Sequence, residues 1–129
     1  MPRTIKNVIR RDETIVRLGG SGDNFHSTWT DDGLIVSVND GSGFREVTGW
    51  EKSFNTKLYR VHGSPPDVTF ADVPGFPASD MDIVRVVGGY YGFATLSVEG
   101  TIYQFQSVVD VPMLFDGAKL VYSPDGGAT

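Results

Sequence analysis

Apolar residues along this chain alternate with polar ones or form short β-branched runs, and turn-forming residues separate these segments. No stretch shows helical spacing that outweighs this alternation over three turns. The best helical candidate is 78–87, where we expect at most one short turn capped by Ser79. The pattern predicts an all-β protein. The expected strands are 14–19, 25–29, 34–38, 56–61, 67–70, 83–98, 101–109 and 119–123.

An internal repeat organises these strands. The stretch STWTDDGLIVSV (27–38) aligns with ATLSVEGTIYQF (94–105), and a second pair of similar stretches begins at Lys57 and Lys119. Each copy corresponds to strands A, B and C of an antiparallel meander, and a strand D follows only in the first copy. Such repeats are typical of propeller blades. We therefore expect a β-propeller fragment of about two blades, and the alternative is a β-sandwich whose hairpins look alike by chance.

The expected blades divide the chain, treated as one propeller-like unit, into two parts. Residues 1–75 would form the first blade with an N-terminal strand, and residues 76–129 a second, incomplete blade. In both blades the second strand (LIVSV and TIYQF) is apolar on both faces, as in sheets that pack between neighbours. Two blades alone leave outer faces bare. We therefore expect self-association, in which the stretch TIKNVIRR (4–11) supplies a strand to a neighbouring copy.

Composition and charge exclude several classes of partner and site. The net charge is −5 and no run of Lys or Arg occurs, so no nucleic-acid partner is expected. The absence of cysteine excludes disulfides and thiolate metal sites, and no His, Asp or Glu cluster has metal-ligand spacing. No apolar run approaches the length of a membrane span, so no membrane partner is expected. The given chain indicates a cytosolic protein, or an extracellular one if a signal segment was removed.

The stretch SPDGGAT (123–129) resembles the Asp-box, S-x-D-x-G-x-T, of sialidase-like propeller blades. The matching residues are Ser123, Asp125, Gly127 and Thr129. In such a turn the aspartate accepts hydrogen bonds from backbone N–H groups, and the glycine permits a positive φ. The resemblance implies a structural turn at the non-catalytic end of a propeller. Because the usual aromatic residue and strand D do not follow, we expect a chain that is truncated or completed by another chain.

A second resemblance covers GDNFHSTWTDDGLIVSVNDGSGF (22–44). This stretch is similar to the opening blade of a bacterial five-bladed propeller family, some of whose members are endo-D-arabinanases. The family's run resembles G-D-N-W-x-x-T-W-A-D-D-G followed by a G-D-G-x-G-F-like turn. Phe25 replaces the family's tryptophan, and VND replaces its W-G-D. The resemblance implies a glycoside hydrolase-like protein acting on a polysaccharide. Some propeller hydrolases hold a central Ca²⁺ ion, whereas the residues by themselves indicate no cofactor.

The alternation of turns in a meander sorts the acidic residues between the two ends of the first sheet. Asp23 precedes strand A and Asp40 follows strand B, so we expect both at one end. Asp31 and Asp32 occupy the A–B turn, at the other end with Asp125. Because propeller ligands sit where the innermost strands begin, Asp23 is the best-placed carboxylate, whereas Asp31 and Asp32 are expected to form the turn.

Glycoside hydrolysis needs two carboxylates, about 5–5.5 Å apart for retention or about 6.5–9.5 Å apart for inversion. Asp23 is the candidate nucleophile or base, unless it only forms an Asx turn. Asp40 is a second acid, a substrate hydrogen-bonding group or a turn residue, and a catalytic partner on another blade is an alternative. The candidates for carbohydrate binding are Asn24, His26, Trp29, Tyr90 and Tyr91. The other hypotheses are a non-catalytic, lectin-like module completed by oligomerisation, and a fragment without function.

Overall fold

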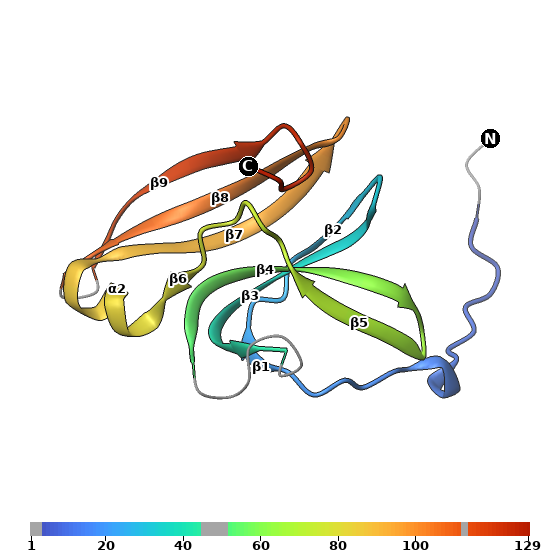
Figure 1. Ribbon diagram of the computed structural model, residues 1–129. Helices are drawn as coiled ribbons and strands as arrows, with labels where there is room; N and C mark the ends of the chain where they lie inside the picture. The colour runs from blue at the N-terminus through green and yellow to red at the C-terminus, as the bar shows by residue number, and fades with distance from the viewer. Residues whose placement is uncertain (1–3, 45–51, 112–113) are drawn as a thin grey trace.

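The computed structural model describes residues 4–44, 52–111 and 114–129 (Figure 1). Two antiparallel sheets contain nearly all of its regular structure, which confirms the all-β class. The first sheet is formed by β1 (Ser21–Asp23), β2 (Ser27–Thr30), β3 (Gly33–Gly43), β4 (Phe54–Ser64), β5 (Asp67–Asp72) and β6 (Ser79–Asp80). The second sheet is formed by β7 (Gly89–Val98), β8 (Thr101–Asp110) and β9 (Leu114–Ser123).

The order of strands follows the internal repeat. In the first sheet, β2, β3, β4 and β5 form a meander of four strands, as expected for A to D. In the second sheet, β7, β8 and β9 form the corresponding three strands, without a fourth among the described residues. The first sheet also includes β6, which pairs with β4 and lies beyond the expected blade boundary at residue 75.

Two expectations about local structure were wrong. Residues 14–19 form no strand: the chain makes a short 3-10 turn, η1 (Asp12–Thr14), and then runs exposed to β1. A strand requires a partner, and the described residues offer none here. The expected strand 83–98 starts only at residue 89, because a seven-residue helix, α2 (Met81–Val87), precedes it.

The helix α2 is longer than the single turn that was expected. Its cap is Asp80 rather than Ser79, because the Asp80 carboxylate accepts a hydrogen bond from the backbone N–H of Asp82 at 2.9 Å. Val84 is buried on the inner side of the helix, which compensates for the low helix propensity of its β-branched residues. Gly88 ends the helix with φ +78°, a conformation that glycine adopts without strain.

The core lies on both faces of the first sheet. One cluster joins the two sheets and is formed by Ile35, Leu58, Val73 and Ile102, with Phe76 packed against it. A second cluster, formed by Val36, Val38, Phe44 and Tyr59, covers the opposite face. The two-sided character that was predicted for β3 is therefore confirmed.

The second sheet differs, because its inner face is covered whereas its other face is covered only at one end, where Tyr91 and Val109 are buried. Ile102, Gln104 and Gln106 alternate along β8 on that inner face and are buried. On the other side, apolar side chains stand exposed to solvent, and we call this surface the outer face of the second sheet. It is formed by Leu96, Val98, Phe105, Leu120 and Tyr122.

Hydrogen bonds fix the second sheet against the first. The backbone of Gly92 in β7 accepts from Asn39 Nδ2 at 2.9 Å and donates to Thr56 Oγ1 at 2.6 Å. A Cβ atom at Gly92 would lie 2.6 Å from the side-chain amide of Gln104, so that amide would have to move. Farther along β7, Ser97 N donates to Thr28 Oγ1 at 2.8 Å. These bonds position β7 beside β2, β3 and β4. In the described part of the chain, no helix has the length and apolar character to span a membrane.

We expect Leu58→Ala to lower the free energy of unfolding by about 2–5 kcal/mol. Leu58 is 4% exposed and lies in the cluster between the two sheets, so its truncation leaves a cavity at their contact. Denaturant titration would measure the change. A matched control is Ile83→Ala on the exposed side of α2, where a change within about 0.5 kcal/mol is expected. Equal effects of the two substitutions would contradict this description of the core.

Candidate functional site

Asp23 and Asp40 come together at one end of the first sheet. Asp23 ends β1 and pairs with Asn39, the residue before Asp40 on β3. Asp40 has a positive φ of 52°, so the strand is irregular at this residue. Its carboxylate accepts a hydrogen bond from the Tyr91 hydroxyl on β7. Asn24 Nδ2 donates to Asp23 Oδ1 at 2.9 Å. The two sheets therefore both contribute to this site.

Arg85 completes the group, which we call the carboxylate cluster: Asp23, Asn24, Asp40, Arg85 and Tyr91. The guanidinium acts electrostatically on both Asp40 and Tyr91. It also lies 3.9 Å from the Asp82 carboxylate and contacts Met81 Sδ within its own helix. Arg85 was not among the site residues expected from the sequence. The sequence did offer one indication that Arg85 is unusual, because no other Lys or Arg occurs between Arg60 and Lys119.

The environment of the cluster changes the pKa of Asp40 from that of an ordinary carboxyl group. Partial burial, assisted by the charge of Asp23, raises the pKa of Asp40, although the Tyr91 hydrogen bond and Arg85 oppose the shift. Burial and the bond to Asp40 raise the pKa of Tyr91, which therefore stays a neutral hydrogen-bond donor. Asp40 thus keeps its proton to higher pH than a solvated carboxyl group, as a general acid requires.

The predicted distribution of acidic residues between the two ends of the sheet is confirmed. Asp31 and Asp32 form the turn between β2 and β3. Arg60 Nη1 lies 3.7 Å from Asp32 Oδ2, and Arg60 Nη2 donates to the carbonyl of Gly126 at 2.8 Å. Asp32 and the turn that contains Asp125 are therefore at the same end, away from the carboxylate cluster.

Three of the predicted binding residues lie outside the carboxylate cluster. Trp29 is 74% exposed and borders a groove at the other end of the sheet, beside Asp32 and His62. Tyr90 points away from Tyr91 because neighbouring residues on a strand face opposite sides. His26 packs its ring edge-on against Phe93 at 6.3 Å, and its buried Nε2 has no hydrogen-bond partner in the described structure.

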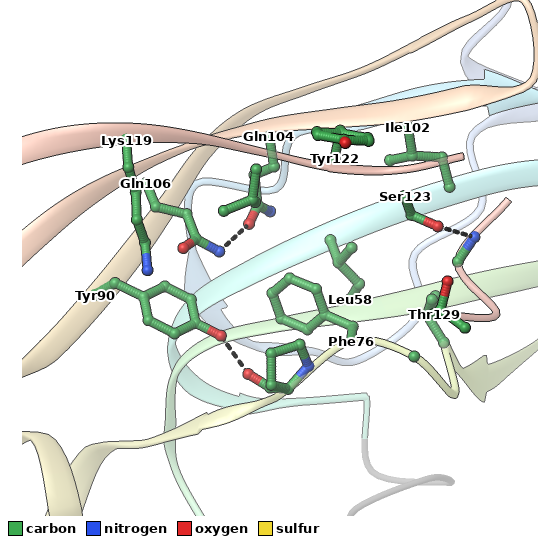
Figure 2. Close-up of a pocket in the computed structure, with 15 residues that line it drawn as sticks. Leu58, Phe76, Tyr90, Ile102, Gln104, Gln106, Lys119, Tyr122, Ser123 and Thr129 are labelled. Carbon is green, nitrogen blue, oxygen red and sulfur yellow. Dashed lines mark hydrogen bonds between the residues drawn. The ribbon is translucent and has the colours of Figure 1, made fainter. Parts of the chain in front are cut away.

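A separate pocket lies between the inner face of the second sheet and residues 73–77 (Figure 2). It has a volume of about 260 Å³. Tyr90 forms one wall, where its ring packs edge-on against Phe76 and its hydroxyl donates to the carbonyl of Pro77. Burial raises the pKa of Tyr90 to about 12, so this hydroxyl stays protonated. The pocket was not expected from the sequence, because residues that are distant along the chain line it.

The turn at 123–129 has the hydrogen bonds that its residues suggested. The Asp125 carboxylate accepts from the backbone N–H groups of Ala128 and Thr129 at 3.1 and 3.0 Å. It also accepts from the hydroxyls of Ser123 and Thr129 at 2.8 and 2.6 Å. Gly127 adopts φ +95° and donates to Ser123 Oγ at 2.8 Å. This network holds the pKa of Asp125 well below its usual value.

We expect the stabilisation from Asp125 to depend on pH. Because its pKa is lowered on folding, this stabilisation is present above the ordinary value of 3.8 and is lost as pH falls below it. Asp125→Ala should therefore lower the melting temperature at neutral pH and have less effect in acid. Thermal melts between neutral and acidic pH would measure this, with Asp116→Ala as the exposed control. If Asp125→Ala lowered the melting temperature equally at neutral and acidic pH, this result would contradict the stabilising role of the ionised Asp125.

No group of three or more His, Cys, Asp or Glu residues in the described ranges is arranged to hold a metal ion. Protein-family models, curated proteins and solved structures give no match when compared with this chain. The residues and the geometry of the carboxylate cluster are therefore the basis on which we infer a function.

Proposed function

We propose that this chain forms blades of a carbohydrate-active β-propeller that acts on a polysaccharide in the manner of a glycoside hydrolase. The observation that carries the proposal is the position of Asp23 opposite Asn39, next to Asp40, whose pKa is raised partly by the charge of Asp23. Glycoside hydrolysis uses two carboxyl groups, one of which must be protonated at the start of the reaction. The raised pKa of Asp40 suits the residue that is protonated in this division of roles.

In the proposed reaction Asp40 acts as the general acid and donates its proton to the glycosidic oxygen, so that the sugar–oxygen bond breaks. Asp23 supplies the second carboxylate, as the base that activates water or as the nucleophile. Tyr91 orients Asp40 through their hydrogen bond, and Asn24 orients Asp23. Arg85 is a positioning residue that stabilises the negative charge left on Asp40 after proton transfer.

Three features support propeller blades over a sandwich. Both sheets are antiparallel meanders whose strands follow the internal repeat. The first sheet packs on both faces, and the second exposes an apolar outer face where a further sheet would pack. The turn at 123–129 has the residues and hydrogen bonds of an Asp-box. A sandwich of two sheets would instead leave both outer faces polar.

Activity against polysaccharides tests the function directly. We expect the purified chain to release reducing ends from at least one member of a panel that includes arabinan, xylan and galactan. Asp23→Asn should abolish this release, whereas Asp31→Asn in the distant turn should leave it unchanged. Hydrolysis that survives Asp23→Asn would remove Asp23 from the mechanism. The absence of hydrolysis from every substrate would remove the hydrolase function.

A non-catalytic sugar-binding module is the second candidate. The observation that favours it is Trp29, whose exposed ring borders a groove beside Asp32 and His62. An exposed aromatic ring next to polar groups is suited to stacking on a sugar. Binding of a polysaccharide without turnover, lost in Trp29→Ala and retained in Asp23→Asn, would support this function over the hydrolase.

A further inference from the structure

The pocket between the sheets has a polar end and an apolar interior. Along its floor, β8 and β9 place Gln106 opposite Lys119 and Ile102 opposite Ser123. Figure 2 shows Lys119, Gln106 and Tyr90 together at one end of the pocket, with Leu58 and Phe76 in its middle. The pocket is thus an amphipathic space that extends along the strands.

The hydrogen bonds of the two glutamines run in one direction. Gln106 Nε2 donates to Gln104 Oε1 at 3.1 Å, and Gln104 Nε2 donates to Thr95 Oγ1 at 3.2 Å. Gln106 Oε1 is the acceptor at the start of this series of hydrogen bonds, and no described residue donates a hydrogen bond to it. Because Gln106 lines the pocket, this oxygen can accept a hydrogen bond from a donor that enters the pocket.

Among the described residues that line this pocket, Lys119 provides the only positive charge. Its ammonium lies 5.2 Å from the centre of the Tyr90 ring and forms no ion pair with a carboxylate of the described chain. A cation at the rim of an apolar cavity favours an anionic ligand group, because a charge-assisted hydrogen bond can then form beside the apolar lining.

We propose that this pocket binds a small 2-hydroxy carboxylic acid with an apolar body. The carboxylate pairs with Lys119 Nζ, the neighbouring hydroxyl donates to Gln106 Oε1, and the body packs against Leu58 and Phe76. The cavity of about 260 Å³ holds one aromatic ring or a short aliphatic chain. None of the pocket residues belongs to the carboxylate cluster, so the inference is independent of the proposed hydrolase function.

Binding of 3-phenyllactate tests the ligand class, measured by isothermal titration calorimetry on the full chain. We expect saturable binding, and about fivefold weaker binding of 3-phenylpropionate, which lacks only the hydroxyl. In nuclear magnetic resonance spectra the ligand should shift the side-chain amide signals of Gln106. The aliphatic acid 2-hydroxyoctanoate is the second ligand to be tested. Tighter binding of this acid than of 3-phenyllactate would show that the apolar part of the ligand is an aliphatic chain rather than an aromatic ring. No saturable binding of either hydroxy acid would overturn the proposal.

Two variants separate the roles of the polar groups. Lys119→Met approximately keeps the length of the side chain and lies on an exposed strand, so it should not disturb folding. The substitution should weaken the binding of 3-phenyllactate about tenfold or more. The matched control Lys52→Met, which does not line the pocket, should bind as the native protein does. In Gln106→Met the two phenyl acids should bind equally, because the acceptor for the hydroxyl is gone. Unchanged affinity in Lys119→Met would overturn the proposal even if Gln106→Met failed to fold.

Discussion

Asp40→Asn is expected to lower the rate of polysaccharide hydrolysis by a factor of about 10²–10⁴. The amide has nearly the same shape as the carboxyl group but donates no proton to the leaving oxygen. The native rate and the variant rate would be compared at saturating substrate by reducing-end release. The matched control is Asp67→Asn, which should leave the rate of hydrolysis unchanged. Asp67 is at the start of β5, at the other end of the first sheet. A loss of less than twofold in Asp40→Asn would contradict the role of Asp40 as the acid.

The pH dependence gives a second measure of the same role. As a general acid, Asp40 is active while protonated, so the rate should fall as pH rises through its raised pKa. The Tyr91 hydrogen bond lowers the pKa of Asp40, opposing the effect of burial. Tyr91→Phe removes this bond and should move the alkaline limb to higher pH. If the alkaline limb of the pH–rate profile stayed in place or moved to lower pH in Tyr91→Phe, a group other than Asp40 would be responsible for it.

Self-association is the second large effect that we expect and propose. At tens of micromolar, light scattering should give a mass well above the 14.0 kDa of one chain. The outer face of the second sheet exposes large apolar side chains, and β9 pairs only with β8 among the described strands. An exposed apolar face beside an unpaired strand edge is a template for another chain.

The proposed occupant of this edge is the N-terminal stretch 4–11 of a second copy. In the first sheet the corresponding edge of β4 is covered by β5. The stretch exposes Ile5, Val8 and Ile9 and runs outside both sheets (Figure 1). It contains three basic residues and no acidic one, whereas residues 89–129 contain four acidic residues and one lysine. Apolar side chains and opposite charge therefore both favour this pairing.

Deletion of residues 4–11 should convert the assembly into monomers, and Leu120→Lys on the outer face should have the same effect. The matched control Val87→Lys, on exposed helix α2, should leave the mass unchanged. Added salt should weaken the assembly because it screens the opposite charges. A native chain that is monomeric at this concentration and melts cooperatively would overturn the association and the two-blade description, and a sandwich would become the better fold.

The sequence by itself determined the strands of the two meanders, their order and the grouping of acidic residues. Side chains alternate with period two in a half-buried strand, so β2 to β5 and β7 to β9 were visible in the pattern. The alternation of turns then placed Asp23 beside Asp40 and Asp32 near Asp125, because antiparallel connections reverse direction at each turn. The role of Asp125 was also local, since its hydrogen-bond partners lie within four residues.

Only the tertiary structure decided which side chains from different segments meet. Helix α2 replaced an expected strand because the Asp80 cap and the burial of Val84 outweighed β-branched propensity. The same helix brings Arg85 to Asp40, and strand β7 directs Tyr91 to the carboxylate cluster while Tyr90 faces the pocket. Residues 14–19 alternate like a strand but remain unpaired in the described structure. Alternation records which positions suit a strand, whereas pairing and packing depend on residues that are distant along the chain.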